Sequence, residues 1–231
     1  MADLVVIVPS RGRPEAAREL LAAFKDTCTA DTRVVFAIDA DDETARQYVD
    51  VGGLWAHVAP APSTMVKTLN FAASIFASYR QGDAAHPPAV GFMGDDHRPR
   101  TVGWDQAYLE ALRELGTGIV YGDDLLQGEN LPTQVAMTSD IVRALGYMAP
   151  PALTHLFVDD FWRDLGRAAD CLRYLPEVVV EHLHPIAGKA EWDEGHKRVN
   201  AASMYAADRV AYTRYRATQF RADVVKVQGL R

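Results

Sequence analysis

The sequence predicts an α/β protein with a mostly parallel sheet flanked by helices and a helical tail at its C-terminal end. Short apolar runs typical of strands buried on both faces alternate with stretches of helical spacing. Polar or acidic residues directly follow three of these strands, after Val8, Ile38 and Met93. Ligands bind parallel α/β sheets beyond the carboxyl ends of the strands, so this edge is where we expect a site.

The predicted elements follow in order from the N-terminus. Strands are expected at 4–8, 33–38, 55–59, 89–93, 119–121, 133–137 and 176–181. Helices are expected from Pro14 to about Lys25 and at 63–79, 104–115, 139–145 and 157–165, followed by a long one at about 198–220. A loop rich in Gly and Asn fills 122–132.

Length and composition fit one large globular domain, or one domain with a small appendage. The chain has 231 residues, 48% of them hydrophobic and 24% charged. No apolar run approaches the roughly 18 residues of a membrane span, and the first residues lack the basic region and cleavage site of a secretory signal. We therefore expect a cytoplasmic protein without membrane association. Two cysteines and no CxxC argue against a disulfide framework or structural zinc.

Charge divides the chain unevenly. From His196 to Arg231 there are eight Lys or Arg and two Asp or Glu, a local charge of +6, whereas the preceding residues have a charge of −13 and the whole chain −7. An acidic body can gather a metal ion, and a basic tail can meet phosphates, although a solvated amphipathic helix also accounts for the tail. We divide the chain into a catalytic domain at 1–195 and a basic helical extension at 196–231.

Two carboxylates, Asp95 and Asp96, follow a predicted buried strand and Gly94. Adjacent carboxylates repel each other, and a divalent cation removes that repulsion. A simple turn cap explains them equally well. His182 and His184 lie two positions apart at the end of another apolar strand and so point to the same side, where they could complete an oxygen-rich site for Mn²⁺ or Mg²⁺. Two packed or surface histidines are the alternative.

A second acidic pair, Asp159 and Asp160, opens a predicted helix. Capping alone accounts for an Asp at a helix start, but a carboxylate held there also stays ionised and can act as a base toward a hydroxyl. Basic and amide groups that could bind a diphosphate or a base edge stand in Ser10-Arg11-Gly12-Arg13 and at Lys67 and Asn70. No GxGxxG, P-loop or GxSxG motif is present.

In this order the segments resemble a glycosyltransferase with the Rossmann-like GT-A fold, closest in style to the family 2-like enzymes. The matching segments are Val5–Arg13, Phe36–Asp39, Phe92–Pro99 in place of the DxD segment, Val158–Asp160 and Glu181–Pro185. Together they extend over roughly residues 3–190. The departure is Gly94, because the family has an acid at the first position of its DxD, and the acceptor half at 122–156 matches no known pattern.

The resemblance implies a hexosyltransferase-like enzyme that moves a sugar from a nucleotide-diphosphate sugar, with a UDP-sugar favoured, to an acceptor hydroxyl. It implies that an Asp base opposite the leaving group inverts the anomeric centre, although a retaining course stays open. The implied nucleotide-sugar site comprises Pro9, Ser10, Arg11, Asp39, Lys67, Asn70 and Asp95. The implied metal ligands are Asp96 with His184 or His182, and the implied base is Asp160, with Asp159 as the alternative.

The acceptor and the oligomeric state are not apparent from the sequence. A basic tail with Tyr212 and Tyr215 interleaved among arginines could hold a nucleic-acid backbone, as in a transferase that glycosylates modified DNA bases and is encoded by some phages. A sugar-phosphate nucleotidyltransferase, a metal-dependent hydrolase and a non-catalytic binding protein with the same fold are the competing interpretations.

Overall fold

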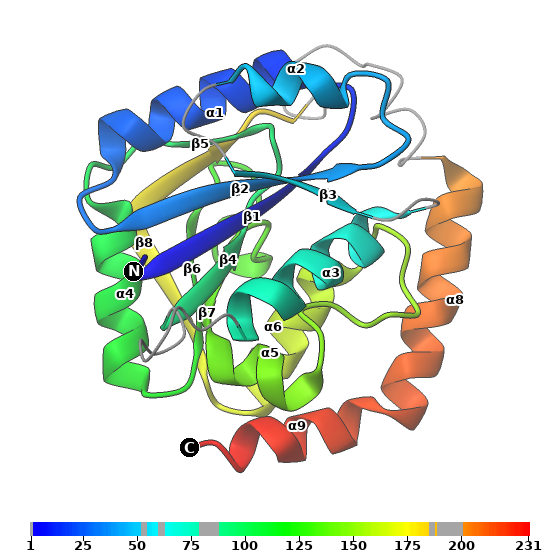
Figure 1. The fold of residues 1–231 in the computed structure, drawn as a ribbon. Coiled ribbons are helices and arrows are strands. Elements are labelled where there is room, and N and C mark those ends of the chain that lie inside the picture. The colour runs from blue at the N-terminus through cyan, green and yellow to red at the C-terminus, as the bar shows by residue number, and fades with distance from the viewer. Residues whose placement is uncertain (1, 52–54, 60–62, 79–87, 185–187, 189–200) are drawn as a thin grey trace.

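The computed structural model describes residues 2–51, 55–59, 63–78, 88–184, 188 and 201–231. Its centre is an eight-stranded sheet in the order β3-β2-β1-β4-β7-β6-β8-β5 (Figure 1). The strands are β1 (Leu4–Ser10), β2 (Thr32–Asp39), β3 (Trp55–Ala59), β4 (Ala89–Phe92), β5 (His97–Pro99), β6 (Ile119–Asp123), β7 (Val135–Thr138) and β8 (Leu172–His182). The predicted mostly parallel α/β sheet is confirmed.

Strands β3, β2, β1 and β4 run parallel, so their carboxyl ends meet at one edge of the sheet. Ser10 of β1 lies opposite Ile38 of β2, beside Asp39. Strand β7 is antiparallel to both β4 and β6, and β8 runs parallel to β6. The last residues of β8 pair antiparallel with β5, with His182 opposite His97. This pairing brings the late histidine segment to the turn that follows β4.

Helices cover both faces of the sheet (Figure 1). The helices are α1 (Pro14–Thr27), α2 (Ala45–Val49), α3 (Met65–Ser78), α4 (Trp104–Leu115), α5 (Ser139–Leu145), α6 (Val158–Ala168), α8 (Ala202–Thr218) and α9 (Phe220–Gln228). In β1 the alternation of side chains places Leu4, Val6 and Val8 in a core with α1 and α4, and Ile7 in a core with α3, α5 and α6. The apolar runs are therefore strands buried on both faces, as predicted.

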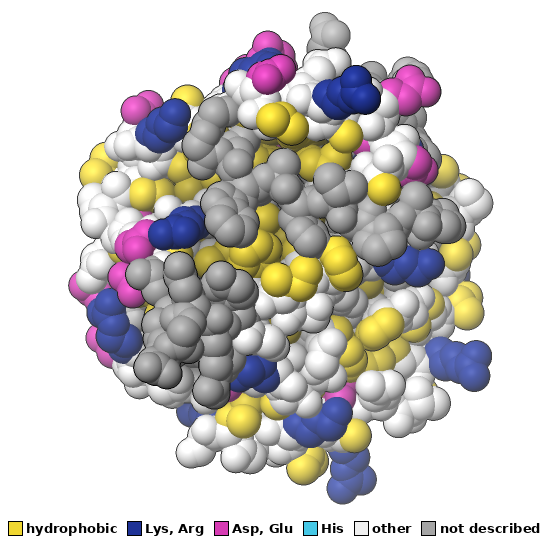
Figure 2. Space-filling view, viewed as in Figure 1, with side chains coloured by type: hydrophobic (Ala, Val, Ile, Leu, Met, Phe, Trp, Pro, Cys, Tyr) yellow, Lys and Arg dark blue, Asp and Glu magenta, His cyan; other side chains and the backbone are white. Residues whose placement is uncertain are grey.

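The tail forms two helices where the sequence predicted one, because the chain bends at Gln219 between α8 and α9 (Figure 1). After the bend α9 turns back under the body, and Tyr212, Tyr215 and Val227 join the core of α3, α5 and α6. Figure 2 shows several Lys and Arg side chains and few acidic ones over these two helices. Whether 196–231 is a separate unit stays a prediction, but its described part shares a core with the body.

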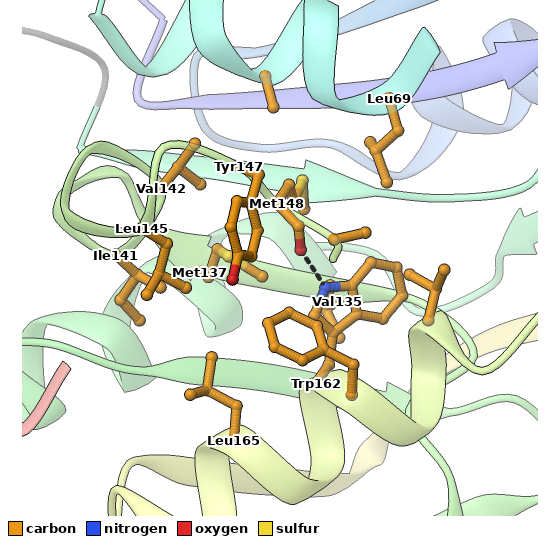
Figure 3. Packing of buried hydrophobic residues seen from close by; sticks show 14 of the residues in the cluster. Leu69, Val135, Met137, Ile141, Val142, Leu145, Tyr147, Met148, Trp162 and Leu165 are labelled. Atoms are coloured by element: carbon orange, nitrogen blue, oxygen red, sulfur yellow. Dashed lines mark hydrogen bonds between the residues drawn. The ribbon is translucent and has the colours of Figure 1, made fainter. Parts of the chain in front are cut away.

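The core beneath α3 is drawn in Figure 3, where side chains from β7, α5 and α6 meet. Trp162 is fully buried there, and its indole N–H donates to the carbonyl of Met148 at 2.8 Å. Loop and helix are therefore joined by a buried hydrogen bond as well as by apolar contact. Among the described residues, no helix is both long and apolar enough to cross a membrane.

Candidate active site

A cleft of about 650 Å³ lies at the carboxyl ends of β1, β2 and β4. Three groups of side chains line it. The first comes from the end of β1, from β2 and from the start of α3, and the second from the turn after β4 and the end of β8. The third comes from 154–156, from Val158 and Asp159, and from Met204 of α8. The cleft brings together Pro9, Ser10, Arg11, Asp39, Asp95, Asp96, Asp159, His182 and His184, all of them predicted site residues.

On the first wall, Arg11 and Asp39 form an ion pair. The guanidinium donates to Asp39 Oδ2 at 3.1 Å and to Asp41 Oδ1 at 2.5 Å. The hydroxyl of Thr68 on α3 donates to Asp39 Oδ1 at 2.7 Å. Both carboxylate oxygens of Asp39 therefore accept hydrogen bonds within the protein. These bonds hold Arg11 and Thr68, which both line the cleft.

Asp95 is buried and ties the loop after β1 to the turn after β4. The Ser10 hydroxyl donates to its Oδ2 at 2.5 Å, and Arg13 pairs with its Oδ1 at 3.0 Å. Tyr48 of α2 meets the Ser10 hydroxyl at 2.8 Å. Burial raises the pKa of Asp95 and the charge of Asp96 adds to the rise, while Arg13 and Ser10 oppose it. Asp95 therefore holds Ser10 and Arg13 in place beside the turn that follows β4.

Asp96, His97 and His182 form the candidate metal centre. Their potential ligand atoms lie within 4.8 Å of one another. Asp96 Oδ1 is 3.4 Å from His97 Nδ1, and Asp96 Oδ2 is 3.4 Å from His182 Nε2. The two imidazoles are stacked, with ring centroids 4.2 Å apart. His184 lines the same cleft and meets the His182 ring edge-on at 5.2 Å.

A divalent transition metal fits this donor set. The Nδ1 atom of His182 is buried without a hydrogen-bond partner among the described residues, although Asp124 Oδ2 lies 3.9 Å away. Imidazole nitrogens favour divalent transition metals, and a carboxylate is a ligand that suits Mn²⁺. His97 Nδ1 accepts the Gly94 N–H at 3.0 Å and is thereby engaged in the turn. We therefore regard Asp96 and His182 as the principal pair of metal ligands.

The missing acid at position 94 has a steric reason. A Cβ atom built on Gly94 would lie 2.4 Å from Asp96 Oδ1 and 3.0 Å from His97 Nδ1. The turn is so tight that a side chain there would displace the carboxylate and the imidazole. Glycine at this position keeps Asp96 beside the two histidines.

Asp124 is a buried residue that the sequence analysis did not single out. Its Oδ2 accepts the Thr133 hydroxyl at 2.8 Å, and its carbonyl accepts the His182 N–H at 3.0 Å. Burial alone would raise the pKa of Asp124, but the pKa is lowered by hydrogen bonds from Gly128, Gln127, Leu126 and Thr133. An ionised carboxylate therefore lies near the His182 ring, and the backbone of Asp124 holds the backbone of His182 in place.

The two aspartates at the start of α6 differ in their surroundings. Asp159 lines the cleft, and burial, with a smaller contribution from the charge of Asp160, raises its pKa to about 6. Asp160 does not line the cleft, and its Oδ1 pairs with Arg163 at 2.6 Å. The sequence analysis named Asp160 first as the base, whereas the geometry favours Asp159.

Lys67 and Asn70 lie outside the cleft-lining set. Lys67 is exposed on α3. Asn70 binds the backbone instead, donating to the Ala149 carbonyl at 2.7 Å and accepting from the Met148 and Ala149 N–H groups at 2.9 Å. The residue of α3 that does line the cleft is Thr68, which spacing alone did not distinguish. Other lining residues without a sequence signal are Thr133, Thr154, His155, Leu156 and Met204.

No protein-family model matches the chain, and no curated protein matches it in sequence. Solved structures do match. TarS of S. aureus has a TM-score of 0.58 at 15% identity, over 90% of this chain, which spans 43% of the TarS chain. Glucosyl-3-phosphoglycerate synthase from Mycobacterium tuberculosis, solved with Mn²⁺, UDP and phosphoglyceric acid, has a TM-score of 0.58 at 11% identity, covering 90% of this chain and 78% of that one.

A third match is the mannosyltransferase PcManGT from Pyrobaculum calidifontis in complex with GDP-Man and Mn²⁺. Its TM-score is 0.54 at 12% identity, over 99% of this chain and 73% of that one. The comparisons confirm the predicted GT-A fold.

Proposed function

We propose that the protein is a metal-dependent, inverting glycosyltransferase that moves a sugar from a nucleotide-diphosphate sugar to an acceptor hydroxyl. The observation that supports it is one cleft, in a GT-A fold, that holds two arginines paired with aspartates on one wall, an Asp–His pair suited to a metal, and the half-buried carboxylate residue Asp159. UDP is bound by the M. tuberculosis synthase and GDP-Man by PcManGT, so both donors are to be tried, with a UDP-sugar first.

Each wall has a role in this reaction. A divalent ion held by Asp96 and His182 would neutralise charge on the departing diphosphate. Arg11 lines the same cleft, and its guanidinium, held in place by Asp39 and Asp41, would donate hydrogen bonds to the diphosphate. Asp159 accepts the proton of the acceptor hydroxyl, because the residue lines the cleft and its raised pKa suits proton transfer near neutral pH.

Donor binding can be tested by thermal shift with UDP-glucose and GDP-mannose, each with and without Mn²⁺. At 100 times its dissociation constant a ligand of the native state stabilises by about 2.7 kcal/mol. We expect a Mn²⁺-dependent shift that Asp96→Asn abolishes and that the exposed control Asp50→Asn retains. A shift with neither donor would contradict the proposal and favour the hydrolase or the binding protein.

For the acceptor we propose DNA held by the exposed face of the tail. Among 201–231 the two acids, Asp208 and Asp223, are both buried, so the surface carries Arg209, Arg214 and Arg221 without an exposed acid. These arginines make no ion pair with other described residues. The expectation that Tyr212 and Tyr215 lie among them on this surface is wrong, because both are buried.

The DNA proposal can be tested by fluorescence anisotropy with a labelled duplex over a salt series. Replacing Arg209, Arg214 and Arg221 by Gln should weaken binding and flatten the salt slope by about 3, since each phosphate contact contributes about 0.9. The matched control replaces the exposed Lys25, Arg33 and Arg46 by Gln, which changes net charge equally. Equal loss in both triple variants would contradict a specific surface on the tail.

A further inference from the structure

Asp208 of α8 is a buried carboxylate that holds the third wall of the cleft. Only 1% of the residue is exposed. Its Oδ1 accepts the Thr154 N–H at 2.9 Å, and its Oδ2 accepts the N–H groups of His155 and Leu156, both at 2.8 Å. Thr154, His155 and Leu156 all line the cleft. Three consecutive backbone donors of this wall therefore converge on one side chain from the tail.

The same helix also supports Phe157, the next residue. Phe157 has a φ of +65°, in the left-handed region that a bulky residue rarely adopts. Its ring packs on Tyr205 at 5.2 Å and on Tyr212 at 5.8 Å. Tyr205, Asp208 and Tyr212 are three and four residues apart on α8, so one face of the helix contacts 154–157 continuously.

This wall leads directly into the candidate base. Phe157 is the residue before α6, and Val158 and Asp159 in its first turn line the cleft. On the other side, the Thr154 carbonyl accepts the Val66 N–H of α3 at 3.2 Å. A change in the position of 154–157 would therefore move Asp159 relative to the donor side. A misplacement of about 1 Å at a reacting group can reduce a rate by about 100-fold.

We infer that Asp208 is a positioning residue of the transfer reaction, which fixes the wall where the acceptor hydroxyl meets Asp159. The inference rests on the proposed function. Helix α8 then contributes to the site in two ways: Met204 lines the cleft directly, and Asp208 holds the residues of its third wall.

The tail offers a matched control for a purely structural role. Asp223 of α9 is equally buried, and its Oδ2 accepts the hydroxyl of Tyr215 at 2.7 Å and that of Tyr147. None of these three residues lines the cleft. Loss of either carboxylate should destabilise the fold, but only loss of Asp208 should change the cleft.

The experiment compares wild type, Asp208→Asn and Asp223→Asn by donor thermal shift, hydrolysis of the donor to free sugar with water as acceptor, and amide hydrogen exchange. For Asp208→Asn we expect faster exchange at 154–156 and a kcat of hydrolysis at least about tenfold lower. Its donor KM and Mn²⁺-dependent shift should stay near wild type. For Asp223→Asn we expect a lower Tm with kcat and exchange at 154–156 unchanged.

The outcomes separate the two claims. A donor shift with unchanged kcat and exchange in Asp208→Asn would overturn the positioning role alone, and an equal loss of kcat in both variants would reduce it to general stability. A wild type without any donor shift would overturn the proposed function and this inference with it. If Asp208→Asn does not fold, Tyr205→Leu perturbs the same face from a half-exposed position and should lower kcat in the same way.

Discussion

At the scale of single residues, Asp159 and Asp160 are neighbours in the chain with opposite surroundings. Asp159 is turned into the cleft, whereas Asp160 is paired with Arg163 on α6. Asp159 lines the cleft with a raised pKa, of which burial is the main cause, and the negative charge of Asp160 adds to the rise.

This arrangement predicts the pH dependence of turnover. A base must be ionised, so the rate of donor hydrolysis should rise with pH through about 6, the pKa of Asp159. Asp159→Asn should abolish this limb, and Asp160→Asn should move it to lower pH because a neighbouring negative charge is removed. A pH–rate profile of the three proteins measures both effects. If Asp160→Asn eliminates activity and Asp159→Asn retains it, the assignment is reversed.

The raised pKa of Asp159 also predicts that Asp159→Asn, although inactive, is more stable than wild type. The pKa of Asp159 in the folded protein, about 6, lies above the value of about 3.9 in an unfolded chain. Between these values the native state binds more protons, so this group lowers the free energy of unfolding as pH rises. Asp159→Asn should therefore have a higher Tm than wild type at pH 7.5, and the difference should shrink toward pH 4. A thermal melt at each pH tests it, and a lower Tm at pH 7.5 would contradict it.

Gly94 yields a further prediction. Gly94→Ala places a Cβ within 2.4 Å of Asp96 Oδ1, which must move, so we expect Mn²⁺ affinity to fall at least about tenfold while the protein stays folded. Mn²⁺ titration followed by electron paramagnetic resonance measures it, with Gly229→Ala as a control remote from the cleft. Gly94→Asp introduces the acid found at this position in the enzymes that the sequence resembles, and tighter Mn²⁺ binding in that variant would show that the turn tolerates a side chain.

At the scale of elements, α3 has separate binding and structural faces. Thr68 meets Asp39 at the cleft, and Asn70 holds 148–149 with three hydrogen bonds. Asn70→Ala should lower the free energy of unfolding by about 2–3 kcal/mol, because buried backbone groups lose their partner. Lys67→Ala should change it by less than about 0.5 kcal/mol. Denaturant unfolding measures both, and a Lys67→Ala variant that loses donor binding would return Lys67 to the site.

Strands β1, β2 and β4 were predictable because their apolar runs are buried on both faces and end at polar clusters. Strand β5 was not, since three residues reading His-Arg-Pro have no strand pattern and pair only because β8 reaches them. Helix α2 was not among the predicted elements, and at its start buried Asp42 accepts the N–H and hydroxyl of Thr44.

The candidate site was predictable where its residues adjoin strand ends, as with Arg11, Asp39, Asp96 and His182. The sequence does not show whether a polar side chain points to solvent, into the cleft or toward other groups of the protein. Asn70, which binds the backbone, and Asp160, which pairs with Arg163, are the examples. His155 and Asp208 carry no local signal, because their contact joins positions 53 residues apart. Part of the negative charge of residues 1–195 comes from buried acids such as Asp105 and Asp124, which accept backbone hydrogen bonds from loops. These acids have a structural role that accounts for their charge without a metal ion.

At the scale of the whole molecule, the tail belongs to the core. Deleting residues after Ala206 removes Asp208 and the buried Tyr212, Tyr215 and Val227. We expect that variant to lose its cooperative thermal transition in circular dichroism. The triple Arg-to-Gln variant of the tail should keep it, because it changes surface charge only. A deletion with an unchanged Tm would show that the body folds without α8 and α9.

The hydrogen bonds that Asp208 accepts from 154–156 can form only after Asp208 has been synthesised, which is late in the chain. Asp96, Asp159 and His182 are all made before Asp208, which follows Asp159 by 49 residues, about 2–10 seconds at about 5–20 residues per second. A nascent chain stalled within that interval would lack both the carboxylate that holds 154–156 and the tail residues that complete the core. The cleft would therefore be completed last during synthesis, when α8 packs on the body.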